Sequence, residues 1–141
     1  MYKSLLVPID INQISSAEQA LPVAVQLCQT FDAKLHLLSV IESIRPEIAT
    51  QLPKDFHQGI TGTTEEKLAE IAKEYIPAAL APEINVAVGT VYHEIINAVE
   101  KFNTDLIVMA SHRPELMDYL IGPNAARVVR HAPCSVMVVR R

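Results

Sequence analysis

The sequence predicts an α/β fold in which one doubly wound parallel sheet of five strands is covered by four helices. Five short apolar runs alternate with four segments in which apolar residues recur every three or four positions. No repeat, low-complexity run or linker divides the 141 residues. Consecutive β-α-β units pack as a parallel sheet through right-handed crossovers, with helices on both faces. We therefore expect a single domain over residues 1–141.

The first two strands and the helix between them have clear signals. Residues 3–9 form an apolar run that ends at Pro8 and Asp10, and residues 12–16 supply candidate N-caps for a helix over about residues 16–31. The buried stripe of that helix is Ala17, Leu21, Ala24, Val25, Cys28 and Phe31. Residues 33–41 are the second strand, apolar as expected for a strand covered on both faces. Its His36 is expected to be a packed or edge residue.

Residues 42–63 contain Pro46, Pro53, Gly59 and Gly62 without a sustained period. This composition predicts a long loop with at most one helical turn, and long loops in compact domains are often functional. A second helix is predicted from Thr64, with Leu68, Ile71, Ala72, Tyr75 and Ile76 on its buried side. Pro77 and Pro82 mark its end.

In the second half of the chain, predicted strands and helices follow one another with short connections. Residues 84–88 are predicted as the third strand, ending at Gly89, and residues 91–102 as the third helix. Residues 105–110 are apolar enough for a central strand. The fourth helix opens near residues 122–124 and continues to Ala132, and residues 135–139 form the fifth strand.

Composition argues against several classes of function. Twelve Lys and Arg face sixteen Asp and Glu, which gives a net charge of −4 and no basic excess for binding nucleic acid. The apolar stretch at the start is too short for a signal peptide or a membrane span. Cys28 and Cys134 fit neither a disulfide framework nor a metal-site spacing. We expect a cytoplasmic protein that does not associate with membranes.

Open parallel sheets bind ligands beyond the carboxyl ends of their strands. The candidate loops follow Pro8, Val40, Gly89 and Ala110. The last of them contains Arg113 and reaches Gly122, whose position at a predicted helix start suits an anion, because unpaired N–H groups and the helix dipole face it. The same residues are equally compatible with a plain turn that starts a helix, since Pro123 is favoured in a first turn.

Residues 105–112, residues 122–140 and residues 5–10 resemble the C-terminal signature and the opening strand of universal stress proteins, and Val88-Gly89-Thr90 resembles their Gly-x-Pro turn. The likeness covers essentially the whole chain. It implies an adenine nucleotide alpha-hydrolase-like sheet with the strand order 3-2-1-4-5. The Ser-His-Arg-Pro and Gly-Pro-Asn segments are similar to the small single-domain subgroup of the enteric bacterial F/G type.

Nucleotide-binding members carry the motif Gly-x2-Gly-x9-Gly-(Ser/Thr), from which this chain departs. Ala110 and Arg113 replace the first two glycines, the spacer has eight residues, and Pro123 replaces the hydroxyl residue. The resemblance implies ATP or ADP as cofactor, with Mg²⁺ arriving on the phosphates. The implied nucleotide-binding residues are Pro8, Ile9, Asp10, Val40, Gly89, Met109, Ala110, Ser111, His112, Arg113, Gly122, Pro123, Asn124 and Ala125. Asp10 would meet adenine or ribose, although a plain turn residue would have the same identity.

The resemblance favours a binding protein with a regulatory or protective role in the stress response. Ser111 and His112 are adjacent on one loop, which is poor geometry for a nucleophile and its base, so we expect slow ATP hydrolysis at most. The loop after the first strand has no glycine to clamp a pyrophosphate, so an adenylyl-transferring enzyme is the lesser alternative. A phosphoacceptor receiver domain needs an acceptor Asp at the end of a central strand, and this chain offers none there. The apolar fifth strand predicts a homodimer, and a nucleotide-free structural homodimer stays open.

Overall fold

The five strands form one parallel sheet with the order β3-β2-β1-β4-β5, as predicted. The computed structural model describes residues 1–42, 54–111 and 123–140. The strands are β1 (Ser4–Pro8), β2 (Lys34–Glu42), β3 (Glu83–Gly89), β4 (Leu106–Ala110) and β5 (Ser135–Val139). Leu5 of β1 pairs with Leu35 of β2 and with Leu106 of β4, so β1 lies at the centre of the sheet.

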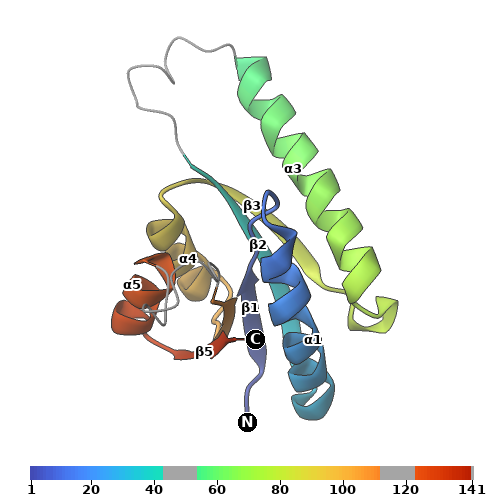
Figure 1. Cartoon of the computed structure of the whole chain (residues 1–141), viewed down its shortest axis with the longest axis vertical. Coiled ribbons are helices and arrows are strands. Elements are labelled where there is room, and N and C mark those ends of the chain that lie inside the picture. The colour runs from blue at the N-terminus through green and yellow to red at the C-terminus, as the bar shows by residue number, and fades with distance from the viewer. Residues whose placement is uncertain (43–53, 112–122, 141) are drawn as a thin grey trace.

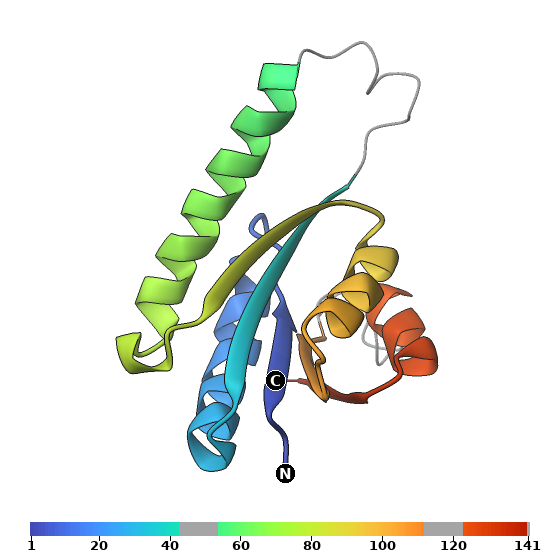
Figure 2. The same ribbon diagram turned by 180° about the vertical axis from the view of Figure 1, so that it is seen from behind.

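Four α-helices lie in the described ranges: α1 (Ile14–Phe31), α3 (Lys54–Tyr75), α4 (Val91–Lys101) and α5 (Pro123–His131), with a 3-10 turn at Ala78–Leu80. Helices α1 and α3 cover one face of the sheet, and α4 and α5 cover the other (Figures 1 and 2). The amino-terminal half of α3 projects past the carboxyl ends of the strands (Figure 1). No helix in these ranges is long and apolar enough to span a bilayer.

Each face of the sheet has its own hydrophobic core. Leu5, Leu35 and Leu37 pack with α1 and α3, whereas Leu6 and Leu38 pack with α4 and α5. The strand period of two sends neighbouring side chains to opposite faces, which is why β1 and β2 bury consecutive side chains, one toward each core. Cys28 belongs to the first core, where burial raises the pKa of its thiol to about 11.

The predicted loop over residues 42–63 is wrong from residue 54 onward, because α3 begins at Lys54. Gly59 and Gly62, interpreted as loop residues, lie inside this helix. The Thr63 and Thr64 hydroxyls donate to the carbonyl oxygens of Gly59 and Ile60, four residues earlier, so they are interior residues and not the expected helix start. The helix forms despite the low propensity of glycine because its later turns are anchored on the core through Leu68 and Ile71.

The structure also answers two smaller predictions, the N-cap of α1 and the environment of His36. Gln13 occupies the N-cap of α1 without a side-chain hydrogen bond, and Ser16 instead donates to the Gln13 carbonyl at 2.9 Å. His36 is a packed residue, 3% exposed, and its ring stacks on Phe102 with the centroids 4.4 Å apart.

Candidate functional site

A cleft of about 980 Å³ opens at the carboxyl edge of the sheet, where the chain crosses from the β2 side of β1 to the β4 side. A reversal of strand order is the usual place for a ligand in an open α/β sheet. The cleft lies at the upper end of the range for small-molecule pockets. Its lining residues are Pro8, Ile9, Asp10, Ile11, Asn12, Ser16, Leu38, Ser39, Val40, Ile41, Glu42, Gly59, Ile60, Thr63, Thr64, Lys67, Val91, Ile95, Met109, Ala110, Asn124 and Ala125.

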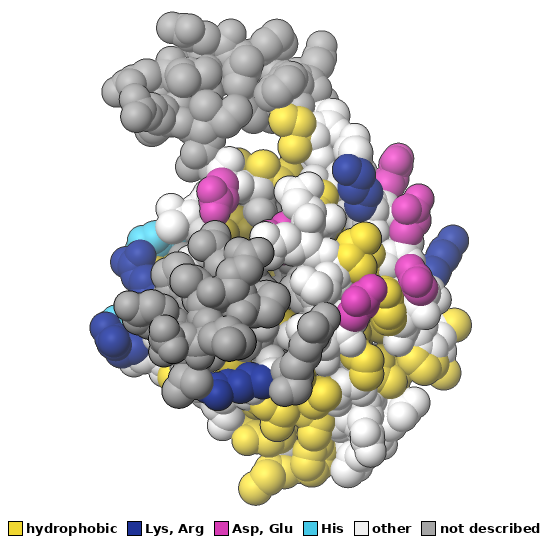
Figure 3. Space-filling view, in the orientation of Figure 1, with side chains coloured by type: hydrophobic (Ala, Val, Ile, Leu, Met, Phe, Trp, Pro, Cys, Tyr) yellow, Lys and Arg dark blue, Asp and Glu magenta, His cyan; other side chains and the backbone are white. Residues whose placement is uncertain are grey.

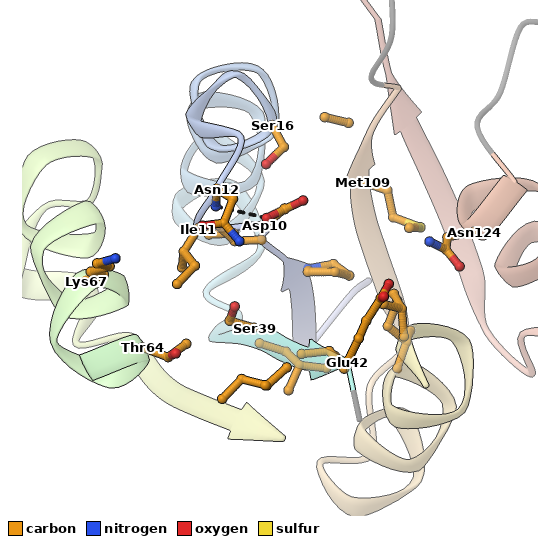
Figure 4. Close-up of a pocket in the computed structure, with 18 of the residues that line it drawn as sticks. Asp10, Ile11, Asn12, Ser16, Ser39, Glu42, Thr64, Lys67, Met109 and Asn124 are labelled. Atoms are coloured by element: carbon orange, nitrogen blue, oxygen red, sulfur yellow. Dashed lines mark hydrogen bonds between the residues drawn. The ribbon is translucent and has the colours of Figure 1, made fainter. Parts of the chain in front are cut away.

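Asp10 stands at the middle of the cleft, just beyond the end of β1 (Figure 4). Its Oδ1 accepts the backbone N–H of Asn12 at 2.9 Å, which closes an Asx turn. The backbone before it is also fixed, because the Ile9 N–H donates to the Leu38 carbonyl at 2.8 Å. Asp10 is therefore a turn residue whose carboxylate is held at the floor of the cleft and keeps a second oxygen for further hydrogen bonds.

Two different walls flank Asp10. On one side, Met109 and Ala110 at the end of β4 meet Asn124 and Ala125 in the first turn of α5. The first backbone N–H groups of a helix have no intrahelical acceptor, so this wall suits an anion. On the other side, Ser39 and the α3 residues Thr64 and Lys67 line the cleft, and Figure 4 shows them across from Met109 and Asn124.

The structure brings eight of the predicted residues together in the lining: Pro8, Ile9, Asp10, Val40, Met109, Ala110, Asn124 and Ala125. Pro123 is the first residue of α5. His112, Arg113 and Gly122 lie outside the described residues. Gly89 and Ser111 are not part of the described lining.

Glu94 lies against the turn at Gly89. A Cβ atom at Gly89 would lie 2.6 Å from Glu94 Oε1, so the glutamate side chain covers this turn, and a φ of 156° there also favours glycine. The backbone N–H of Ser111 donates to the Val139 carbonyl at 2.9 Å, which ties the end of β4 to β5.

The lining from α3 was missed by sequence reasoning. Gly59, Ile60, Thr63, Thr64 and Lys67 recur at helical spacing on one face, in register with the buried Leu68. That period was the available signal, and the glycines concealed it. Within the described lining, Lys67 is the sole Lys or Arg, and Asp10 and Glu42 are the carboxylates. No group of three or more His, Cys, Asp or Glu in the described part of the chain could hold a metal ion by itself.

Comparison with known proteins gives consistent matches over the whole length. The model of the universal stress protein family matches residues 1–140. Universal stress protein G of Shigella flexneri is 28% identical over 143 residues, covering 99% of this chain and 100% of the relative. Universal stress protein A homolog 1 of Coxiella burnetii is 27% identical over 143 residues, covering 98% of this chain and 96% of the relative.

Solved structures show the same fold. Universal stress protein UspA from Lactobacillus plantarum superposes with a TM-score of 0.69 at 26% identity, covering 99% of this chain and 98% of that one. A universal stress protein in complex with cAMP has a TM-score of 0.63 at 19% identity, with 99% and 97% covered. The Archaeoglobus fulgidus universal stress protein in complex with dAMP has a TM-score of 0.63 at 16% identity, with 98% of each chain covered.

Proposed function

The chain belongs to the universal stress protein family, and from that premise we propose that it binds an adenine nucleotide in the cleft at the carboxyl edge of its sheet. It acts as a regulatory or protective binding protein in the stress response. The observation that carries this proposal is the Asp10 carboxylate, held by the Asn12 N–H at 2.9 Å in the middle of a cleft of about 980 Å³.

The middle of the cleft has the chemistry that a nucleoside needs. Aliphatic side chains of Val40 and Ile41 offer an apolar surface to a base, and the remaining Asp10 oxygen can accept a hydrogen bond from a ribose hydroxyl or an amino group. Two relatives of the same fold support the adenine class, since one was solved with cAMP and another with dAMP.

The phosphate end of the ligand is assigned to the first turn of α5. Asn124 and Ala125 line the cleft there, and their backbone N–H groups lie among those without an intrahelical acceptor. Pro123 has no N–H, so the backbone of Asn124 carries more of that role. Gly122, Arg113, Ser111 and His112 complete the proposed phosphate surroundings by family resemblance alone.

ATP and ADP would bring Mg²⁺ on their phosphates. Asp10 and Glu42 provide the carboxylate oxygens of the described lining, and Mg²⁺ is commonly held by one or two carboxylates together with phosphate oxygens. The residues therefore fit a nucleotide-borne ion. We propose that hydrolysis stays far below the ~10 per second of ordinary enzymes, because Ser111 and His112 are adjacent in the chain, which is poor geometry for a nucleophile and its base.

Binding is tested by calorimetry and thermal melting with AMP, cAMP, ADP and ATP, with and without Mg²⁺. A ligand at a hundred times its Kd should stabilise the native state by about 2.7 kcal/mol. Asp10→Asn keeps an oxygen to accept the Asn12 N–H but removes the charge, so it should weaken binding about tenfold, the loss expected for a hydrogen bond to a charged group.

Asp32→Asn is the matched control, because Asp32 caps α1 in the left-handed conformation that asparagine also tolerates. Its affinity should equal that of the parent protein. The proposal fails if no adenine nucleotide binds, and the assignment of Asp10 fails if both variants bind equally well. Turnover in the ordinary enzyme range would overturn the binding-protein proposal.

We also propose a homodimer paired through β5 and a cytoplasmic location. β5 is an edge strand of the sheet, and Met137 is 37% exposed on it, which leaves an apolar surface beside unpaired backbone groups. Met137→Lys should shift the protein to monomer, and light scattering measures the mass. A parent protein that is monomeric at tens of micromolar would refute the dimer. The free thiols Cys28 and Cys134 fit a reducing compartment.

A further inference from the structure

The α3 side of the cleft is unused by the proposed nucleotide site. That site assigns the base and ribose to Asp10 and Val40 and the 5′-phosphate to α5, beside β4 and β5. Helix α3 packs on β2 and β3, on the other side of β1. In Figure 4, Thr64 and Lys67 lie across the cleft from Met109 and Asn124, with Asp10 between them. The cleft therefore continues past the nucleoside in the direction away from its phosphate.

Five of the residues that line this side of the cleft come from α3. Gly59, Ile60, Thr63, Thr64 and Lys67 lie at helical spacing and together form the α3 subsite. Thr64 is 4% exposed, and the Thr63 and Thr64 hydroxyls donate to the helix backbone, so their protons are already used and Lys67 is the side-chain donor of the subsite. Ile60 adds an apolar surface. Among the described residues, none lies within 4 Å of the position that a Cβ atom of Gly59 would take.

Lys67 supplies the charge of the subsite. It is exposed on a helix whose other surface residues include Glu65, Glu66, Glu70 and Glu74, and acidic side chains border this side of the molecule in Figure 3. The ion pairs within the described residues join Glu83 to Lys34 and to His36, and neither involves Lys67. Its ammonium group thus remains available to a ligand, with three N–H donors.

We propose that the α3 subsite binds a second anionic group, a phosphate or a carboxylate, next to the nucleotide. The inference rests on the proposed function, because it takes the nucleoside to lie over Asp10. The group is either a substituent of the nucleotide on the side away from its 5′-phosphate or a separate small anion. Lys67 recognises its charge, and Gly59, which has no side chain, gives it room.

The experiment compares four titrations by calorimetry: AMP, AMP in the presence of inorganic phosphate, adenosine 3′,5′-bisphosphate, and AMP succinylated on its exocyclic amine. At least one of the last three should bind about two- to fivefold more tightly than AMP, the gain typical of an exposed ion pair. The gain should shrink as salt is added. A gain with free phosphate identifies a separate anion as the source, and a gain with a substituted nucleotide identifies a covalent arm.

Two pairs of matched variants on α3 assign the gain to the subsite. Lys67→Gln removes its charge, whereas Lys73→Gln removes the same charge from the last turn, outside the described lining. Gly59→Leu fills the surface at the subsite, whereas Gly62→Leu places the same side chain at a position that is equally free of described neighbours but outside that lining. The gain should be lost in Lys67→Gln and Gly59→Leu and kept in Lys73→Gln and Gly62→Leu, with circular dichroism confirming the fold of each.

The proposal is overturned if none of the three conditions improves on AMP, or if the gain survives both Lys67→Gln and Gly59→Leu. The proposed function has a separate outcome. If AMP does not bind but a substituted nucleotide binds in a manner that requires Lys67, the subsite stands and the assignment of a simple nucleotide falls. If no ligand binds at all, both are wrong.

Discussion

The two ends of the sheet differ in how their polar groups are used. At the amino end, Asp105 accepts the backbone N–H of Lys3 at 2.8 Å and that of Ser4 at 3.1 Å, and the Ser4 hydroxyl donates to the Phe102 carbonyl at 3.1 Å. These bonds join β1 to the segment between α4 and β4, about a hundred residues later in the chain. Asp105 and Ser4 thus find their partners within the protein.

At the carboxyl end the polar side chains face a cleft. Asp10 holds one backbone N–H, and no described residue forms an ion pair with Asp10, Glu42 or Lys67. The sheet thus uses one end to join distant segments and leaves the other end open to a ligand. Loss of a polar group at the amino end should therefore change stability without changing binding, and loss of one at the carboxyl end should do the reverse.

Asp105→Ala gives the sharpest test of this division. It removes a partly exposed carboxylate that accepts two backbone N–H groups, so the free energy of unfolding should fall by about 2 kcal/mol, and denaturant titration measures it. The nucleotide affinity of the folded fraction should stay the same. Asp10→Asn should show the opposite pattern, with binding weakened and stability within about 0.5 kcal/mol of the parent. The division is refuted if both substitutions change both quantities to a similar extent.

The projecting half of α3 offers a smaller effect of opposite sign. Gly59 and Gly62 are helical, and a Cβ atom at either position would meet no described residue within 4 Å. Gly62→Ala and Gly59→Ala should each raise the free energy of unfolding by about 0.5–1 kcal/mol, because alanine loses less conformational entropy on folding. Chemical denaturation measures the gain. A loss of stability in either variant would show that a side chain does not fit at that position.

His36 gives the smallest effect and tests the amino end by pH. Burial among Phe102 and the strands lowers the pKa of its imidazole, while Glu83, whose Oε2 is 3.1 Å from Nδ1, partly opposes the shift and Lys34 adds to it. As the pH falls, the unfolded chain therefore binds a proton at His36 before the folded protein does. The contribution of neutral His36 to stability is full at neutral pH and is lost as the pH drops below about 6.5, the ordinary pKa of histidine.

His36→Phe keeps a ring on Phe102 and removes the titration, so the variant should lose less stability than the parent between pH 7 and pH 5. Glu83 does not interfere in this interval, because the hydrogen bond from Lys34 lowers the pKa of its carboxyl further below 4.5. Equal pH dependence of the parent and His36→Phe in denaturant melts would contradict a neutral, buried His36.

The periodicity of the sequence was enough to predict the strands, because each is a short apolar run between turn residues. Residues 135–139 and 105–110 are examples, since the strands fall within one residue of the predicted bounds. The first half of α3 could not be predicted in this way. Its two glycines lower local helix propensity, and the packing of Leu68 and Ile71 on the sheet overrides that preference.

The sequence by itself determined the fold class, the family and the residues at the ends of β1 and β4, because these follow from local period and from motifs that are continuous in the chain. Tertiary structure decided the shape of the cleft. It brought Lys67 and Thr64 beside a loop more than fifty residues earlier, and it covered Gly89 with Glu94. The physical reason is that strand order and helix packing decide which residues far apart in the chain become neighbours. A local sequence pattern carries no information about such contacts.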